Sequence, residues 1–153
     1  MLMRKLLIIS SIILCLVACA PGHNDYSDFR NINAEGWAYG DTLVFSPEFG
    51  DSIARGTLCL ALRHSNSYIY SNFWVEVCYE DNSISRTDTL NVQLADIYGR
   101  WYGSGFGARY QVVDTIASDV ILHRGKPVKV RHIMRVDTLH GIEQVGINFI
   151  PCN

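Results

Sequence analysis

The sequence predicts an all-β protein, built as a single antiparallel β-sandwich of about seven or eight strands with an immunoglobulin-like or jelly-roll-like arrangement. Apolar and polar residues alternate with a period of two along most of the chain, as they do in strands that bury one face. Turn-forming stretches such as EDNS, HRGKP and LHG separate many of these segments. Beyond the first 18 residues, no window of about 12 residues or more has a helical period. Many short strands in one domain indicate a sandwich or a barrel, and the sandwich is the commoner solution.

The first 18 residues are typical of a lipoprotein signal peptide. Arg4 and Lys5 precede an apolar run over residues 6–17, which is shorter than the roughly 20 residues that a spanning helix needs. The run ends in LVAC, residues 16–19, which resembles the lipobox of bacterial lipoproteins. We therefore expect Cys19 to be diacylated and to become the first residue of the mature protein. Two or more acyl chains at one end are enough for stable membrane anchoring.

The residues after Cys19 bear on location and domain organisation. Residue 20 is alanine, not aspartate, which in Gram-negative lipoproteins implies release to the outer membrane. No acidic cluster follows directly, and this favours the periplasmic face. Residues 19–29 are expected to form the lipidated cysteine and a polar tether, and residues 30–153 the sandwich domain, whose length suits one domain.

Taken in chain order, the alternating segments predict the individual strands. In TLCLALRH, residues 57–64, the leucines share one face, and in FWVEVCYE, residues 73–80, the phenylalanine and valines do. The other strands are expected at 42–46, 87–94, 109–116, 128–136 and 143–150. We interpret RHSNSYIYSN as the link of a hairpin, which puts Cys59 and Cys78 near cross-strand register. Whether they bond is left open, because adjacent strands often miss the Cα separation of roughly 4.4 to 6.8 Å that a disulfide requires.

Charge and cysteine usage exclude several classes of function. Removing the signal peptide leaves 11 basic against 15 acidic residues, and the basic ones are dispersed. A nucleic-acid partner is therefore not expected. The cysteines after Cys19 are three in number and form no CxxC pair, which gives no support to a zinc or redox site. We expect no cofactor.

The glycine-rich stretch IYGRWYGSGFGARY, residues 97–110, is the most distinctive loop of the chain. A phosphate-binding loop would present backbone N–H groups at the start of a helix. The residues that follow are instead β-branched and alternating, and no GKS or GKT ending is present. We interpret the stretch as a loop between strands, where glycines allow backbones to pass closely and Trp101 packs down as a lid.

No set of residues predicts catalysis or metal binding. His64 and His132 fall on the apolar faces of their segments, where a core or rim histidine is expected rather than a ligand. Ser104 lies between two glycines but lacks the strand before and the helix after that a nucleophile elbow needs. Acidic residues in or near strands leave a glycosidase pair open, although solvent-facing positions explain them better: Asp41, Asp88, Asp114 and Asp137.

The order of residues in and around the glycine loop adds a family resemblance. Glycines at 99, 103, 105 and 107 and Trp101 follow LNVQLAD at 90–96. Together with the lipobox, LRHSNSYIYSNFWVEV at 62–77 and IMRVDTLHGIEQVGINF at 133–149, this pattern resembles the GldH family of gliding-motility lipoproteins over nearly all of the mature chain. His132 stands where the family pattern leads us to expect glutamine.

The resemblance implies an outer-membrane lipoprotein that serves where a gliding and type IX secretion machinery operates, with other envelope proteins as partners. No ligand or reaction follows from it. We expect a non-catalytic protein and place the candidate partner-binding surface near the glycine loop and the last segments, at Trp101, Tyr102, Arg131, Arg135 and Asp137, with the last three alternating onto one strand face. The alternative is a carbohydrate-binding module, since aromatic rings such as Trp74 could stack on sugars. A row of exposed, coplanar rings would favour that alternative.

Overall fold

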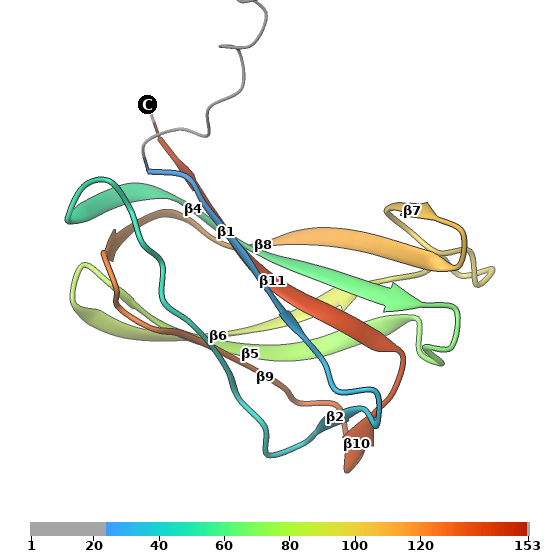
Figure 1. The fold of residues 1–153 in the computed structure, drawn as a ribbon. Helices are drawn as coiled ribbons and strands as arrows, with labels where there is room; N and C mark the ends of the chain where they lie inside the picture. Colours follow the sequence, from blue (N-terminus) through green and yellow to red (C-terminus); the bar gives the residue numbers. More distant parts are fainter. Residues whose placement is uncertain (1–23, 153) are drawn as a thin grey trace, which may run out of the picture.

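The structure is a computed structural model that describes residues 24–152. The signal peptide and Cys19 lie outside the described residues. Within 24–152 the regular structure is β throughout (Figure 1), in elements β1 (Tyr26–Asn31), β2 (Trp37–Ala38), β3 (Leu43–Phe45), β4 (Ile53–Ser65), β5 (Asn72–Asp81), β6 (Ile84–Gln93), β7 (Ser104–Phe106), β8 (Arg109–His123), β9 (Val128–His132), β10 (Thr138–Leu139) and β11 (Ile142–Pro151). The same residues hold no helix with the length and apolarity to cross a membrane.

Two antiparallel sheets face each other and form a sandwich. One sheet has the strand order β1-β11-β4-β8-β7 and the other β3-β9-β5-β6, while β2 and β10 make a small separate ribbon. Figure 1 shows the two layers stacked, with β5, β6 and β9 below β4, β8 and β11. The predicted all-β sandwich is therefore confirmed.

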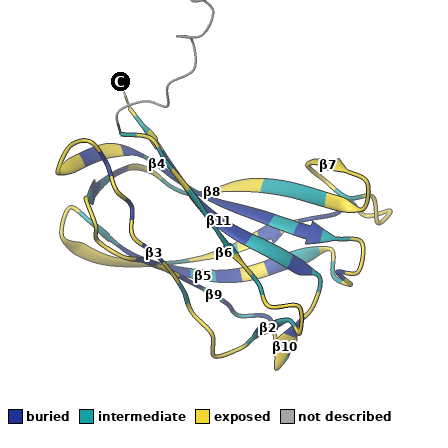
Figure 2. Cartoon of the chain, viewed as in Figure 1, coloured by how far each residue is buried: buried dark blue, intermediate teal, exposed yellow. Residues whose placement is uncertain are grey.

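The core lies between the sheets and is formed by the alternating apolar residues. The buried positions follow the expected period of two in β5, where every second side chain from Phe73 to Tyr79 is buried. In β4 the leucines at 58, 60 and 62 point into the core, but Cys59 and Ala61 on the opposite side are buried as well. They are small residues of a central strand with β11 on one side and β8 on the other. Figure 2 shows this buried centre and the exposed loops at both ends.

The structure corrects the predicted hairpin between the second and third expected strands. β4 belongs to the five-stranded sheet and β5 to the four-stranded sheet, so the connecting segment crosses the sandwich. Cys59 and Cys78 therefore lie on the outer sides of opposite sheets, and both are free thiols. Alternation specifies which face of a strand is buried but not which strand is its neighbour.

Two strand boundaries also differ from the expectation. β1 begins at Tyr26, inside the stretch expected to be tether, because its backbone pairs with β11 along its whole length. β9 ends at His132 instead of running to residue 136. Ile133 still donates its N–H to the carbonyl of Trp74 (3.0 Å), but the N–H of Trp74 donates to the sulfur of Met134, 3.3 Å away, and the ladder goes no further.

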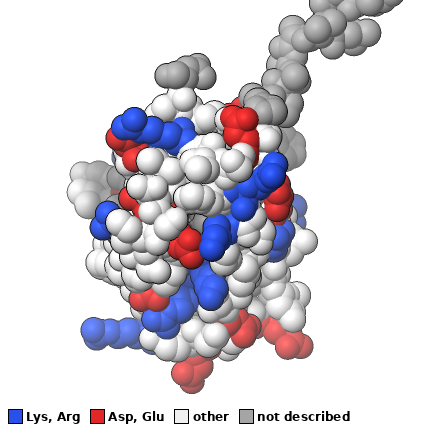
Figure 3. Space-filling view, turned by 90° about the vertical axis from the view of Figure 1, so that its left-hand side faces the viewer, with Lys and Arg blue, Asp and Glu red and all other residues white. Residues whose placement is uncertain are grey.

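The chain enters and leaves the sandwich at the same end. Tyr26 at the start of β1 is the register partner of Phe149 near the end of β11. We call this the near end, and the opposite end, where β11 begins, the far end. Figure 3 views the near end and shows basic and acidic side chains interleaved, without a surface of one sign. Ion pairs such as Arg55–Asp119 and Lys126–Glu80 account for this mixture.

Candidate functional site

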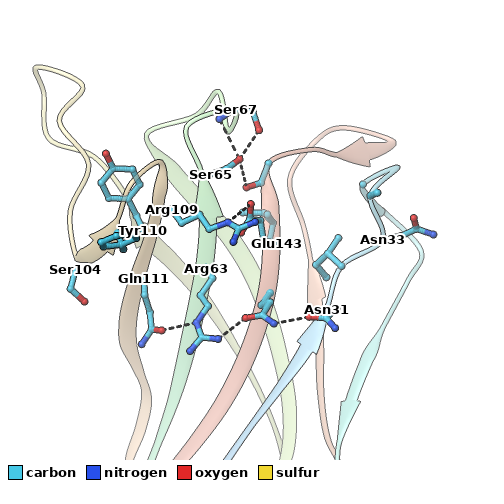
Figure 4. Close-up of a pocket in the computed structure, with 18 residues that line it drawn as sticks. Asn31, Asn33, Arg63, Ser65, Ser67, Ser104, Arg109, Tyr110, Gln111 and Glu143 are labelled. Carbon is cyan, nitrogen blue, oxygen red and sulfur yellow. Dashed lines mark hydrogen bonds and ion pairs between the residues drawn. The ribbon is translucent and has the colours of Figure 1, made fainter.

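A cleft of about 950 Å³ opens at the far end of the five-stranded sheet. Its floor is formed by the outer side of strands β8, β4, β11 and β1, and its walls by β7 and by residues 32–36 after β1 (Figure 4). Most of its side chains are polar, and those that carry the argument below are Asn31, Arg63, Arg109, Gln111, Glu143 and Gln144.

A row of four hydrogen-bonded side chains crosses the floor of this cleft. Arg63 donates from Nε to Gln111 Oε1 (2.7 Å) and from Nη1 to Gln144 Oε1 (2.5 Å). Gln144 Nε2 in turn donates to Asn31 Oδ1 (2.6 Å). Each pair is also a register pair of neighbouring strands, so antiparallel pairing alone brings the four side chains into line (Figure 4). We call these four residues the polar row.

The guanidinium of Arg63 also contacts an aromatic ring, that of Phe29. Its guanidinium carbon lies 3.9 Å from the centroid of Phe29, within the range of a cation–π contact. Phe29 in turn lies over Gly146, where an added Cβ would be 2.6 Å from the ring. The absence of a side chain at Gly146 therefore makes room for the ring that supports Arg63.

The chemistry of arginine determines which way the amides of the polar row point. A guanidinium has only donors, so both glutamine carbonyl oxygens must face Arg63. The amide nitrogen of Gln144 then faces Asn31, whose carbonyl oxygen accepts from it. The side-chain groups of the row left over from these bonds are N–H donors: Gln111 Nε2, Asn31 Nδ2 and Arg63 Nη2.

Above the polar row, an ion pair and two aromatic rings form the upper part of the cleft. Arg109 on β8 contacts Glu143 on β11 at 2.9 Å. Because the Arg109 side chain is largely exposed, this pair contributes only about 0 to 1 kcal/mol to stability. Phe106 on β7 is 96% exposed, and Tyr110 on β8 is partly buried. The cleft thus combines a cationic, donor-rich floor with an apolar rim.

Of the residues predicted to bind a partner, Trp101 and Tyr102 lie at the far end. The Trp101 ring packs edge-on against buried His64, with centroids 4.6 Å apart, so it does cover the core. Tyr102 is 46% exposed and is fixed by its N–H, which donates to the carbonyl of Leu94. Gly103 has a φ of +85°, and a Cβ there would lie 2.0 Å from the carbonyl oxygen of Gln111. Gly103 and Gly105 thus serve close backbone passage between strands, as expected, whereas Gly99 and Gly107 have open space around them and a positive φ.

The other three predicted residues do not share a strand face. Arg131 lies on the outer side of β9 and donates to Glu76 at 2.7 Å, and this hydrogen bond lowers the pKa of the Glu76 carboxyl. Because β9 ends at His132, Arg135 and Asp137 are in the loop that follows. Arg135 lines a second hollow, of about 520 Å³, beside Trp74. The predicted alternation of these three residues is therefore wrong.

Both internal histidines are core residues. His64 and His132 are fully buried, and burial lowers the pKa of each. His132 Nε2 lies 3.1 Å from the carbonyl oxygen of Trp37. Across residues 24–152, no three side chains of His, Cys, Asp or Glu gather as a metal site would require.

Sequence reasoning missed the polar row. Arg63 is separated from Gln111 by 48 positions and from Gln144 by 81, so no local pattern joins them. Only the register of β4 with β8 and β11 brings them together.

Comparisons with known proteins give a family and a loose set of structural likenesses. The family model described as GldH lipoprotein matches residues 24–149. The search of curated proteins gave no match. Among solved structures, the chain is similar to a carbohydrate-binding module of Cel9A from Ruminococcus flavefaciens, with 13% identity over 82% of this chain and 98% of that one and a TM-score of 0.47. It is also similar to the PRD1 vertex protein P5, with 10% identity over 88% and 100% of the two chains and a TM-score of 0.40. These scores are too low to carry an argument about function.

Proposed function

The chain belongs to the GldH lipoprotein family, and on this premise we propose that it is a lipid-anchored, non-catalytic binding component of a gliding-motility or type IX secretion assembly. The observation that carries the proposal is the family match over residues 24–149, which spans nearly all of the described sandwich. Membership in a lipoprotein family makes it an envelope protein. The outer membrane and its periplasmic face are the finer part of the proposal, supported by alanine at position 20 and by the residues after Cys19.

The fold supports a definite orientation on the membrane. With Cys19 as the anchor, residues 20–25 span at most about 20 Å when fully extended. β1 starts at the near end, so the near end stays close to the lipid. β11 has 10 residues, which corresponds to about 33 Å at the usual rise of a strand. In the proposed arrangement the far end, with the glycine loop and the cleft, therefore points away from the membrane.

The far end is also the part best suited to contact a partner. It presents Tyr102 and Phe106 as exposed rings beside a cleft with charged and amide side chains. An exposed mixture of aromatic and arginine side chains is the composition that protein interfaces favour. The exposed rings do not form one coplanar row, because Trp74 lies on the four-stranded sheet and Phe106 on the five-stranded one.

The proposal is tested in the native host with a deletion strain and four complementing genes. Wild type, Cys19→Ala and the double variant Tyr102→Ser/Phe106→Ser are expressed at equal level, and surface spreading and secreted protein are measured. Crosslinked lipoprotein is also purified from membranes and its partners are identified by mass spectrometry. Arg55→Gln, at the near end, is the control for surface changes.

We expect wild type and Arg55→Gln to restore spreading or secretion and to recover components of a motility or secretion complex. Cys19→Ala should leave the protein soluble or unprocessed and restore neither process. The double variant should stay on the membrane but lose its crosslinked partners. A deletion strain that spreads and secretes normally, with no envelope protein recovered, would overturn the proposed function.

A further inference from the structure

We propose that the far-end cleft is a binding site for an acidic polysaccharide, whose carboxylates and ring oxygens are held by the polar row. The inference goes beyond the proposed function, since it names a ligand class for a site that the family match does not assign. It rests on the geometry of four strands and stands whether or not the protein takes part in motility.

The charge of Arg63 is not neutralised by the side chains around it. Its neighbours in the row are the neutral amides of Gln111 and Gln144, and it forms no ion pair with any carboxylate among residues 24–152. A guanidinium without a counter-ion attracts an anion more strongly than a paired one. At a half-buried position such as that of Arg63, water also screens this attraction less. Of the two arginines in the cleft, Arg109 is already paired with Glu143, so Arg63 is the cation left for a ligand.

The polar row also has unused hydrogen-bonding groups, and these are mainly donors. Its three carbonyl oxygens accept bonds within the row, and its remaining groups are donors that face an acceptor-rich ligand. Neighbouring strands are about 4.8 Å apart, so these donors are spread over roughly 14 Å across the strands. An extended chain lying across the sheet therefore meets several donors at once.

These properties favour a glycan over an acidic peptide. A peptide carries one backbone N–H on almost every residue, and each needs an acceptor when it is buried. In the polar row each amide oxygen already accepts one bond and the groups without a partner are N–H donors, so a peptide backbone would find few acceptors there. A uronic-acid chain has carboxylate, ring and glycosidic oxygens that accept, and its hydroxyl groups can donate to water or to Ser65, Ser104 and Glu143 at the edge of the cleft. The exposed ring of Phe106 gives the apolar face of a sugar a surface to pack against.

Binding is tested with the mature lipoprotein purified in detergent and with polygalacturonate as the probe. Neutral dextran and poly-glutamate of similar length are the comparison ligands, and affinity is measured by titration calorimetry at low and at high salt. Arg63→Gln removes the cation of the row. Arg55→Gln makes the same change in charge at the near end, where Arg55 pairs with Asp119, and is the matched control.

We expect wild type and Arg55→Gln to bind polygalacturonate with equal affinity, weaker at high salt, and to bind neither dextran nor poly-glutamate. Arg63→Gln should weaken binding at least tenfold, since charge-assisted bonds are the strong ones. If it unfolds, as judged by circular dichroism, the double variant Asn31→Ala/Gln111→Ala replaces it, because it removes the neutral donors at both ends of the row and should weaken binding severalfold. Equal binding of poly-glutamate, no binding of polygalacturonate by wild type, or an equal loss in Arg55→Gln would overturn the proposal.

Discussion

Replacing Gly146 with alanine should lower the free energy of unfolding by about 1 to 3 kcal/mol, the usual cost of forcing extra volume into a packed contact. The new Cβ would lie 2.6, 2.7 and 2.9 Å from three carbons of the Phe29 ring. The ring must then move, and it would leave its position under Arg63, 3.9 Å from the guanidinium carbon. Because Phe29 is only partly buried, it has room to swing outward, and we expect a cost in the lower half of this range.

The reasoning is tested by a double-mutant cycle with Phe29→Ala. Without the ring the clash is gone, and Gly146→Ala should then be neutral or stabilise the strand by roughly 0.5 to 1 kcal/mol, because alanine loses less backbone freedom on folding than glycine. The two changes should therefore be strongly non-additive. Urea unfolding of the four proteins, followed by circular dichroism, measures each free energy. If Gly146→Ala costs the same with and without Phe29, the contact between them is not the cause.

Three further predictions concern the core, the thiols and the buried histidines. Leu60→Ala should cost about 2 to 5 kcal/mol in urea unfolding, since Leu60 is almost fully buried; a cost under 1 kcal/mol would contradict its central place. Non-reducing mass spectrometry should find no Cys59–Cys78 disulfide, because these thiols lie on opposite sheets, and alkylation should be slowest at Cys59, where burial raises the pKa. Burial lowers the pKa of His64 and His132 in the folded protein. Below the histidine pKa of about 6.5 in the unfolded chain, that chain therefore binds more protons than the folded protein. The free energy of unfolding should accordingly fall as the pH drops through that value. His64→Gln/His132→Gln should flatten that slope; an unchanged slope would refute the assignment.

The long strands could be predicted from the sequence because burial dictates their pattern. β5 alternates strictly, and the leucines of β4 mark its core face. β1, β2, β7 and β10 could not be predicted, and β7 lies inside the glycine-rich stretch that was interpreted as a loop. β1 is an edge strand with mixed residues, and β2 and β10 have two residues each, too few for any period to show.

The sequence does not show which strands pair with one another, and this pairing also determines the cleft. The link after β4 has a composition that suits a hairpin as well as a crossing between sheets, so the pairing of β4 with β5 was wrong. The same limit hid the polar row, whose members are each unremarkable alone and meet only through register. The glycine loop was interpretable because its residues are contiguous and φ > 0 at Gly103 has a local cause.

The pairing of the first described strand with the last has a mechanical consequence. β1 lies at the sheet edge and all six of its residues pair with β11. If tension is applied between a lipid anchor before β1 and a load held at the far end, the force acts along these strands. It loads the hydrogen bonds of the whole β1–β11 ladder in shear and together, whereas a pull across the strands would open them one after another. The sandwich is therefore oriented to transmit a sustained pull from its anchor to whatever its far end holds.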